Sequence, residues 1–174
     1  TKSFAEKGKA SAFEITEGVT IIGDSVTLRA TPQLQAALPD AIIDAQGSRN
    51  TQQAYDIMMT SIQNGTLMKE VVIATGVNTI PNYEEQLNKI VADLPNGHHL
   101  ILVTPYDGNY PYYDSPIAEM HTQYVYTLAK EYDFIAVADW NKVSKENPQI
   151  WEGSDLIHFG GNNDPTMRGG SRHP

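Results

Sequence analysis

The feature that most constrains the fold is a set of five short apolar runs spread along the 174 residues, each followed by a turn signal. The runs are rich in β-branched residues, and short continuous runs of this kind are typical of strands buried in a parallel sheet. Amphipathic segments separate them. This alternation predicts a doubly wound, three-layer α/β/α sandwich around a five-stranded parallel sheet. The expected strands are 19–22, 41–44, 71–74, 100–103 and 134–138.

Four of the amphipathic segments predict helices. The first is expected to start at Thr31 and Pro32, because threonine caps helices well and proline fits the first helical turn. It would run through Leu38, with a kink relative to a short turn after Ser25. The other three carry apolar residues at helical spacing on one face. The expected helices are 31–38, 51–63, 82–93 and 115–131.

Composition excludes several function classes. The chain has 12 basic and 21 acidic side chains, a formal net charge of -9 and no cluster of Lys and Arg, so no nucleic-acid partner is expected. It has no cysteine, which excludes disulfides, thiolate zinc sites and a cysteine nucleophile. The sequence contains no zinc-ligand spacing, phosphate-binding loop or dinucleotide fingerprint, so neither a metal nor a cofactor is expected.

The length fits one domain. We expect a single domain over 1–174, with a core of about 18–160 and terminal extensions at 1–17 and 161–174. No run approaches the roughly 18 apolar residues that a membrane span needs.

Ligands of doubly wound sheets bind at the carboxyl ends of the strands, so candidate site residues belong to the loops that follow them. Gly23-Asp24-Ser25 follows the first run. A serine on a sharp strand-to-helix turn exposes its hydroxyl near helical N–H groups, which suits an acyl-transfer nucleophile. Alternatively, Asp24 and Ser25 only cap the next helix. These three residues leave both interpretations open.

Two further loops offer hydrogen-bond donors. Gly47 follows the second run, and its backbone N–H can approach an oxyanion closely because glycine has no side chain. Taken alone, this glycine is more typical of an ordinary turn that ends a strand. Asn78 follows the third run, and its side chain can either donate to a developing oxyanion or make a local turn hydrogen bond.

A carboxylate and an imidazole, Asp155-x-x-His158, follow the fifth run. The carboxylate can accept a hydrogen bond from Nδ1–H and leave Nε2 free to deprotonate a serine. Such pairs are also common in surface loops. Together with the residues after the first three runs, however, the pair supplies a nucleophile, two oxyanion donors, a base and an orienting group at one sheet edge.

These residues resemble, in order and spacing, the four sequence blocks of the SGNH (GDSL) hydrolase superfamily over about residues 18–160. The segments 22–29 and 44–49 look closer to one branch, the extracytoplasmic catalytic domains of A-type peptidoglycan O-acetyltransferases of Gram-positive bacteria. The resemblance implies the flavodoxin-like SGNH hydrolase fold. The matching blocks are Gly23-Asp24-Ser25, Gly47, Gly76-Val77-Asn78 and Asp155-x-x-His158.

The resemblance also implies a catalytic triad of Ser25, His158 and Asp155. The oxyanion hole would consist of the Ser25 and Gly47 backbone N–H groups and the Asn78 side chain. The implied activity transfers an acetyl group, through an acetyl-Ser25 intermediate, to the C-6 hydroxyl of N-acetylmuramoyl residues in peptidoglycan, which blocks lysozyme. Esterase activity would accompany it, and members of this kind use no metal.

Partners and location follow from the same resemblance. The catalytic domains of this branch are fused to an integral-membrane acyltransferase domain. We therefore expect the acetyl donor to be delivered by such a domain, which is absent from this chain, and the acceptor to be a peptidoglycan glycan. The expected location is the extracellular face of the cell membrane, at the cell wall, as a domain of a membrane-anchored protein.

Some residues are candidates for contacts with the substrate. Val77 can form an apolar wall that keeps water from the acyl group. Four tyrosines in the loop after the fourth run can stack on sugar rings or, as the alternative, cover the core. His98 and His99 are expected to be solvated turn residues, and His121 to have no catalytic partner. The four tyrosines are Tyr106, Tyr110, Tyr112 and Tyr113.

Two other functions remain open at this stage: a carbohydrate or lipid acetylesterase with the same triad, and a non-catalytic flavodoxin-like binding module.

The sequence also departs from the superfamily in two places. Thr79 follows Asn78 where many esterases have aspartate, and residues 159–174 show no helical period where a final helix is usual.

Overall fold

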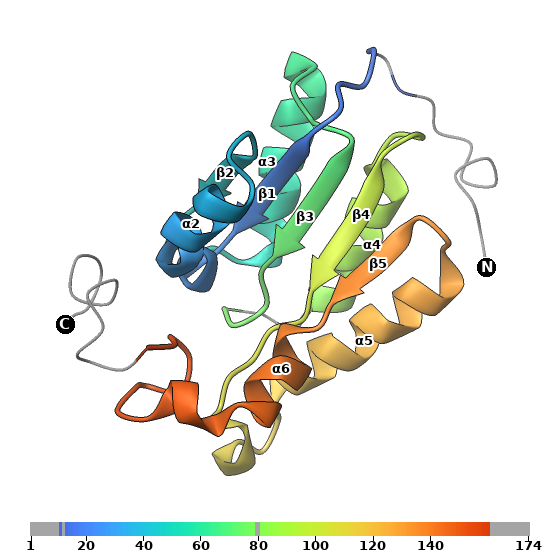
Figure 1. The fold of residues 1–174 in the computed structure, drawn as a ribbon. Coiled ribbons are helices and arrows are strands. Elements are labelled where there is room, and N and C mark those ends of the chain that lie inside the picture. The colour runs from blue at the N-terminus through green and yellow to red at the C-terminus, as the bar shows by residue number, and fades with distance from the viewer. Residues whose placement is uncertain (1–10, 12, 79–80, 161–174) are drawn as a thin grey trace.

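The computed structural model describes residues 11, 13–78 and 81–160. Five parallel strands form one sheet in the order β2-β1-β3-β4-β5, which confirms the expected five-stranded parallel sheet (Figure 1). The chain moves outward from β1 to β2 and then to β3 on the other side of β1, so the strand order reverses beside β1. The strands are β1 (Val19–Gly23), β2 (Ile42–Ala45), β3 (Glu70–Ala74), β4 (His99–Val103) and β5 (Ile135–Ala138).

The helices agree with expectation except at two places. The first begins at Ser25, not at Thr31, because the Asp24 carboxylate caps it by accepting the Val26 N–H at 3.0 Å, and Pro32 lies inside it. A helix that starts at Trp140 was not expected; it is only seven residues long and is capped by Asp139. The α-helices are α2 (Ser25–Ala37), α3 (Thr51–Asn64), α4 (Tyr83–Asp93), α5 (Ile117–Glu131) and α6 (Trp140–Glu146), and the 3-10 helices are η1 (Tyr110–Tyr112) and η2 (Pro148–Trp151).

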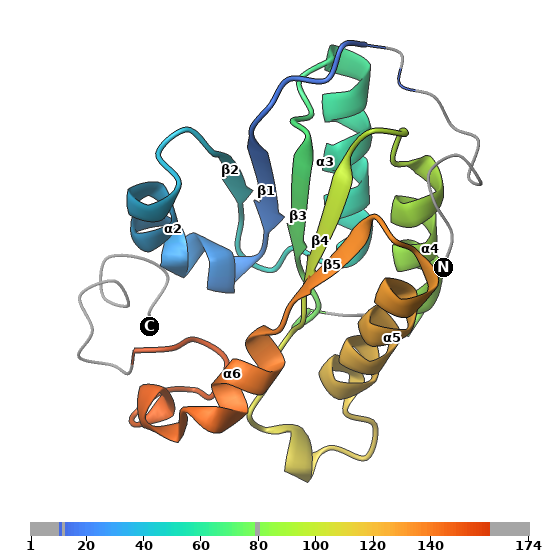
Figure 2. The same cartoon turned by 45° about the vertical axis from the view of Figure 1, so that its right-hand side comes forward.

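The helices cover the two faces of the sheet unequally. α3, α4 and α5 lie on one face, whereas α2 and α6 lie on the other, close to the carboxyl ends of the strands (Figures 1 and 2). The hydrophobic core fills the space under α3, α4 and α5. Its members on the strands include Ile22, Val71, Ile73, Leu100 and Leu102, each at most 2% exposed.

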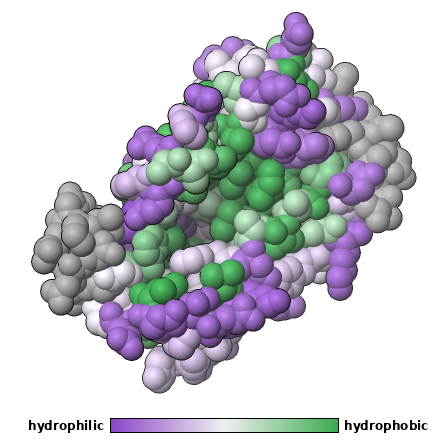
Figure 3. Space-filling view, in the orientation of Figure 1, coloured by the Kyte–Doolittle hydropathy of each residue, from purple (hydrophilic) through white to green (hydrophobic). Residues whose placement is uncertain are grey.

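The face between α2 and α6 is hollowed by an apolar groove of about 610 Å³. Side chains of the sheet, among them Ile21, Val72 and Val103, form its floor. Figure 3 shows the hollow as a hydrophobic area with a hydrophilic border. Within the described ranges, no helix is both long and apolar enough to cross a membrane.

Candidate active site

Ser25 is the first residue of α2 and lies at the carboxyl end of β1. The turn into the helix is tight, since a Cβ on Gly23 would lie 2.2 Å from the Thr27 hydroxyl oxygen. The Asp24 N–H donates to the Ala74 carbonyl at 3.2 Å, which ties the turn to the end of β3. Asp24 does cap the helix, as one interpretation of the sequence held, and the cap leaves the Ser25 hydroxyl available for another contact.

That contact is made with His158, which is 133 residues away in the chain. Ser25 Oγ lies 2.7 Å from His158 Nε2, and His158 Nδ1 lies 2.8 Å from Asp155 Oδ2. Because an ionised carboxylate only accepts hydrogen bonds, Nδ1 carries the proton and Nε2 accepts from the serine hydroxyl. The structure therefore joins the three residues of the predicted triad in one hydrogen-bonded chain.

Asp155 is held by the backbone as well as by the imidazole. Its Oδ1 accepts the N–H groups of Ile157 at 2.9 Å and His158 at 2.7 Å. Burial opposes ionisation, but the hydrogen bonds from His158 and Ile157 outweigh it and hold the pKa of Asp155 below its ordinary value. The carboxylate thus stays charged in the pH range where an imidazole titrates.

Asp24 has the opposite environment. It is 3% exposed, and this burial raises its pKa to about 6, against the lowering effect of the N–H groups of the first helical turn. A positive charge on the nearby His158 also lowers the pKa of Asp24. The two carboxylates of the site therefore differ in pKa because burial dominates at Asp24, whereas hydrogen bonds from His158 and Ile157 dominate at Asp155.

The candidate oxyanion donors lie in the loops after β2 and β3. Gly47 is exposed, and a Cβ added to it would meet no atom within 4 Å. The Asn78 side-chain amide donates to the Arg49 carbonyl at 3.3 Å, which joins the two loops. Their role as oxyanion donors stays a prediction, and Thr79, the departure from the family pattern, lies outside the described residues.

Arg49 was missed by the sequence interpretation. Its guanidinium is 5% exposed and donates to the Gly23 and Asp44 carbonyls and to the Asp44 carboxylate. The available signal was an arginine five residues after an aspartate at a strand end. It joins the loop after β2 to the strand that precedes Ser25.

The candidate substrate-contacting residues lie in different environments. Val77 lines the apolar groove. Of the two roles that the sequence left open for Tyr106, packing is the one observed: it is 9% exposed, its ring packs on Trp151 with centroids 4.9 Å apart, and it too lines the apolar groove. Tyr112 and Tyr113 are exposed, and Tyr110 lies under the Lys145 ammonium, 4.8 Å from its ring centroid.

The tyrosine loop packs directly against the loop of the predicted triad. The Gly108 N–H donates to the Leu156 carbonyl at 2.8 Å, and the Asn109 side chain donates to the Asp155 carbonyl at 3.2 Å. Asp107 is buried and accepts the Tyr113 hydroxyl at 3.0 Å. Hydrogen bonds from the loop after β4 therefore hold the Asp155–His158 loop in place, and no local sequence pattern indicated this contact.

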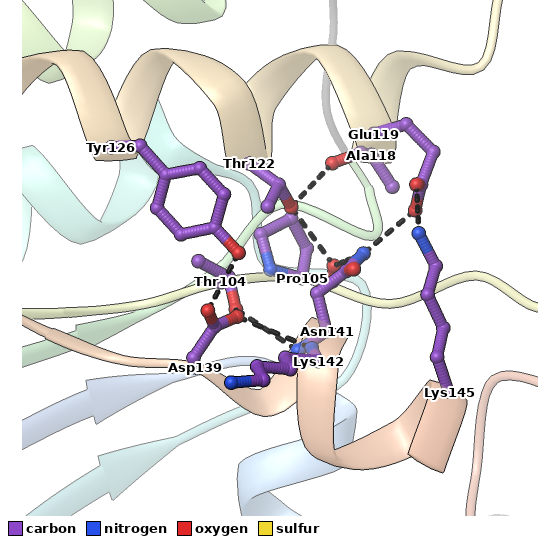
Figure 4. A network of polar contacts seen from close by, with 10 residues as sticks. All are labelled: Thr104, Pro105, Ala118, Glu119, Thr122, Tyr126, Asp139, Asn141, Lys142 and Lys145. Carbon is purple, nitrogen blue, oxygen red and sulfur yellow. Dashed lines mark hydrogen bonds and ion pairs between the residues drawn. The ribbon is translucent and has the colours of Figure 1, made fainter.

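A polar network anchors the start of α6 to α5 and to the end of β4 (Figure 4). Asp139 accepts the hydroxyls of Thr104 at 2.8 Å and Tyr126 at 2.6 Å, and burial together with this bond raises the pKa of Tyr126 to about 12. Asn141 donates to Glu119 at 2.6 Å and links α6 to α5. The network thus positions the start of α6.

Aromatic packing connects α6 to the Asp155–His158 loop. Trp140, the first residue of α6, packs on Trp151 and Phe159 with centroids 5.8 and 6.0 Å apart. Phe159 directly follows His158. The aromatic cluster therefore fixes both sides of the loop that carries the imidazole.

His98, His99 and His121, the other histidines that the structure describes, take no part in this site. The expectation of a solvated turn is wrong for His98, which is fully buried and bonds to the Met68 carbonyl at 2.7 Å, whereas His99 is exposed beside Glu70. His121 is buried in α5 and stacks on Tyr83, and burial lowers its pKa to about 4. In the part of the chain that the structure describes, no three acidic or histidine residues form a group that could hold a metal ion.

Solved structures of other proteins share this fold. A GDSL-like lipase from Bacteroides thetaiotaomicron has a TM-score of 0.64 at 18% identity, covering 87% of this chain and 83% of that chain. An acetyl xylan esterase from Geobacillus stearothermophilus has a TM-score of 0.62 at 15% identity, covering 83% and 88%. The sheet and its helices are thus those of the SGNH (GDSL) hydrolases.

A more similar structure is the C-terminal catalytic domain of peptidoglycan O-acetyltransferase A from Streptococcus pneumoniae, solved with a methylsulfonyl adduct. It is 47% identical, with a TM-score of 0.83, over 90% of this chain and 87% of that chain. No protein-family model and no curated protein matches the chain. The chain belongs to the family of peptidoglycan O-acetyltransferase A catalytic domains, within the SGNH (GDSL) hydrolase superfamily.

Proposed function

We propose that this chain is a serine-dependent O-acetyltransferase that acetylates the C-6 hydroxyl of N-acetylmuramoyl residues in peptidoglycan. The observation that carries the proposal is the hydrogen-bonded chain from Ser25 through His158 to Asp155, with contacts of 2.7 and 2.8 Å. Membership of the peptidoglycan O-acetyltransferase A family supports the choice of acceptor. In this proposal Ser25 is the nucleophile, His158 the base and Asp155 the orienting group.

The first step is attack on the acetyl donor. His158 Nε2 accepts the Ser25 proton as Oγ bonds to the acetyl carbon, and Asp155 stabilises the imidazolium that forms. The carbonyl oxygen becomes an oxyanion, which the N–H groups of Ser25 and Gly47 and the amide of Asn78 stabilise. Each such donor is worth about 3 kcal/mol in the transition state. Collapse of the intermediate expels the donor's leaving group, which takes the proton from His158.

The second step transfers the acetyl group. The C-6 hydroxyl of the glycan loses its proton to His158 and attacks the acetyl-Ser25 carbonyl, and the Ser25 oxygen leaves and regains a proton. When water replaces the glycan hydroxyl, the same residues release acetate, so esterase activity accompanies transfer. The exposed rings of Tyr112 and Tyr113 are candidates for stacking on the acceptor sugar.

Val77 is the residue we expect to influence the choice between glycan and water. It lies next to Asn78 and its side chain faces the apolar groove. A branched apolar side chain beside the acyl group would disfavour water. Val77→Ala should therefore lower the ratio of acetyl transfer to acetate release; an unchanged ratio would contradict this role.

Location and donor delivery are part of the proposal. The domain would act at the extracellular face of the cell membrane, where peptidoglycan is found, and would receive acetyl groups from a membrane acyltransferase domain. Acetylated muramoyl residues would then resist lysozyme. The family relationship supports this placement.

The experiment has two arms. In the first, methanesulfonyl fluoride is added and the intact mass and peptide map are measured; we expect one sulfonyl group on Ser25 and none in Ser25→Ala, with Ser61→Ala as the matched control. In the second, an acetyl donor and a chitooligosaccharide or muropeptide acceptor are supplied and the acetylated glycan is quantified. Ser25→Ala should lower turnover by about 10⁴-fold or more.

The outcomes separate the alternatives. Release of acetate with no acetylated glycan under any acceptor would leave a carbohydrate or lipid acetylesterase. Failure of the sulfonyl fluoride to label Ser25, together with no turnover, would favour a non-catalytic binding module.

A further inference from the structure

Arg49 is the point where three site-forming loops meet. Its Nη1 donates to the Gly23 carbonyl at 3.1 Å and to the Asp44 carbonyl at 2.7 Å. Its Nη2 donates to the Asp44 carboxylate at 2.8 Å and to the Gln46 side chain at 3.3 Å. One guanidinium thus fixes the end of β1, just before the nucleophile loop, to the end of β2.

The charged side chain of Arg49 is buried. The side chain is 5% exposed, whereas its partner Asp44 is 50% exposed. A buried guanidinium is tolerated only when its donors are used, because desolvation of an unpaired charge is costly. The planar fork fits several oxygens in fixed directions, which a lysine ammonium cannot reproduce.

The backbone of the same residue contacts the third loop. The Arg49 carbonyl accepts one N–H of the Asn78 side-chain amide at 3.3 Å. Since the amide carries two N–H groups, this bond sets the orientation of the group and leaves the second N–H to point at a reacting oxygen. Beside it, the Thr51 and Thr75 hydroxyls share a buried hydrogen bond of 2.9 Å, which joins the start of α3 to the loop after β3.

The loop that carries Gly47 is under strain. Ser48, between Gly47 and Arg49, has a φ of 62°, a left-handed conformation that a serine adopts only when the surroundings impose it. The Asn50 side chain caps α3 on one side and Arg49 fixes the loop on the other. Without the guanidinium contacts, the loop can relax and its N–H groups can turn away.

From this geometry we infer that Arg49 is a positioning residue, which orients the Asn78 amide and the Gly47 N–H for the oxyanion. The inference rests on the proposed function, since it presumes an oxyanion at Ser25. Arg49 acts through its neighbours, and it does not need to contact the substrate.

The test compares Arg49→Met, Arg49→Lys, Asn78→Ala and the double variant Arg49→Met with Asn78→Ala, using hydrolysis of 4-nitrophenyl acetate. We expect Arg49→Met to lower kcat about 10- to 100-fold with KM changed less than about twofold, the pattern of an interaction made in the transition state. Arg49→Lys keeps the charge but not the fork, so it should recover only part of the loss.

Non-additivity is the deciding measurement. If Arg49 acts through Asn78, the double variant loses less activity than the product of the two single losses. In Arg49→Met, hydrogen exchange of the Asn78 side-chain amide, followed by NMR, should also become faster. Leu67→Ala is the matched control: it removes a buried side chain near the amino ends of the strands, so it should lower the melting temperature and leave kcat unchanged.

Two outcomes would overturn the inference: a folded Arg49→Met with wild-type kcat, or losses that multiply in the double variant. If Arg49→Met does not fold, the same comparison is made with Arg49→Lys. Failure of the proposed function looks different: either the wild type itself shows no turnover, or Ser25→Ala and Asn78→Ala leave turnover intact, whatever Arg49 does.

Discussion

The two faces of the sheet are built differently. Under α3, α4 and α5 the strand side chains are packed, with Val71 and Leu100 fully buried. Between α2 and α6 the sheet forms the floor of a 610 Å³ apolar groove, and Ala136 and Ala138 are exposed. Parallel sheets are normally buried on both faces, so the open face is the unusual one.

The difference shows that stability and the candidate site rest on different interactions. The packed face supplies apolar burial, which is worth roughly 25 cal/mol per Å². At the carboxyl edge, directional hydrogen bonds take over: Asp24 caps α2, the Asp139 network of Figure 4 holds α6, and the Arg49 guanidinium joins the ends of β1 and β2. Directional bonds set the geometry of a site more closely than apolar contact does.

The largest expected effect concerns Asp24, a buried carboxyl on the open side. Its pKa in the folded protein, about 6, exceeds its ordinary value of 3.8. The folded state therefore holds this proton more tightly, and the stability it contributes is full below pH 3.8 and lost as pH rises through 6. The loss approaches about 3 kcal/mol, since one pKa unit is worth 1.36 kcal/mol.

Asp24→Asn keeps an equally good helix cap but cannot ionise. We expect its free energy of unfolding, measured with urea, to exceed that of the wild type by up to about 3 kcal/mol at pH 7.5 and to match it at pH 4. Other titrating groups, including Asp155, are common to both proteins and cancel. An equal difference at the two pH values would contradict the raised pKa.

The next effect compares the two faces directly through neighbouring valines of β3. Val71 is fully buried on the packed face, whereas Val72 is half-buried in the groove. Val71→Ala should lower the free energy of unfolding by about 2.5 kcal/mol, because it removes buried methyl groups and leaves a cavity. Val72→Ala should lower it by about 1 kcal/mol or less.

Urea unfolding at pH 7 measures both variants, and each is the control for the other because residue type and strand are the same. Equal losses would mean that the groove is covered as completely as the core in solution, and the contrast between the faces would disappear.

Much of this architecture was predictable from the sequence because it depends on local patterns. The β-branched runs marked all five strands to within about one residue, and their carboxyl ends placed Ser25, Asn78 and His158 at one edge. That these residues meet follows from topology, which short apolar runs and right-handed crossovers largely determine. The contact of Ser25 with His158 also needs a chain after β5 that is long enough to return to this edge.

The rest was not predictable because it depends on contacts between distant segments. Thr31-Pro32 looked like a helix start, but the cap at Asp24 decided where α2 begins. His98 looked polar and solvated, yet it is buried because the Met68 carbonyl, 30 residues away, accepts its bond. Tyr106 is likewise buried by a distant residue, Trp151, whose ring packs on it.

A smaller effect is expected where the loop after β4 touches the triad loop. A Cβ on Gly108 would lie 2.8 Å from the Leu156 Cβ and 3.1 Å from the Leu156 carbonyl oxygen. Gly108→Ala should therefore cost about 1–2 kcal/mol of stability by overpacking and push the Asp155–His158 loop outward. A displacement of this kind should lower kcat about tenfold with 4-nitrophenyl acetate. Unchanged kcat at reduced stability would show that the triad loop is independent of the loop after β4.

The smallest effect on stability is expected at Gly47, on the exposed side of the same edge. Its φ lies outside the left-handed region, and an added Cβ meets no atom within 4 Å, so Gly47→Ala should change the free energy of unfolding by less than about 0.5 kcal/mol. If the Gly47 N–H faces the oxyanion, the new methyl group lies beside the acyl group, and kcat/KM should fall about tenfold. Gly108→Ala would then lower both stability and activity, whereas Gly47→Ala lowers activity alone. Wild-type activity in Gly47→Ala would place the substrate away from this loop and leave Asn78 and the Ser25 N–H as the oxyanion donors.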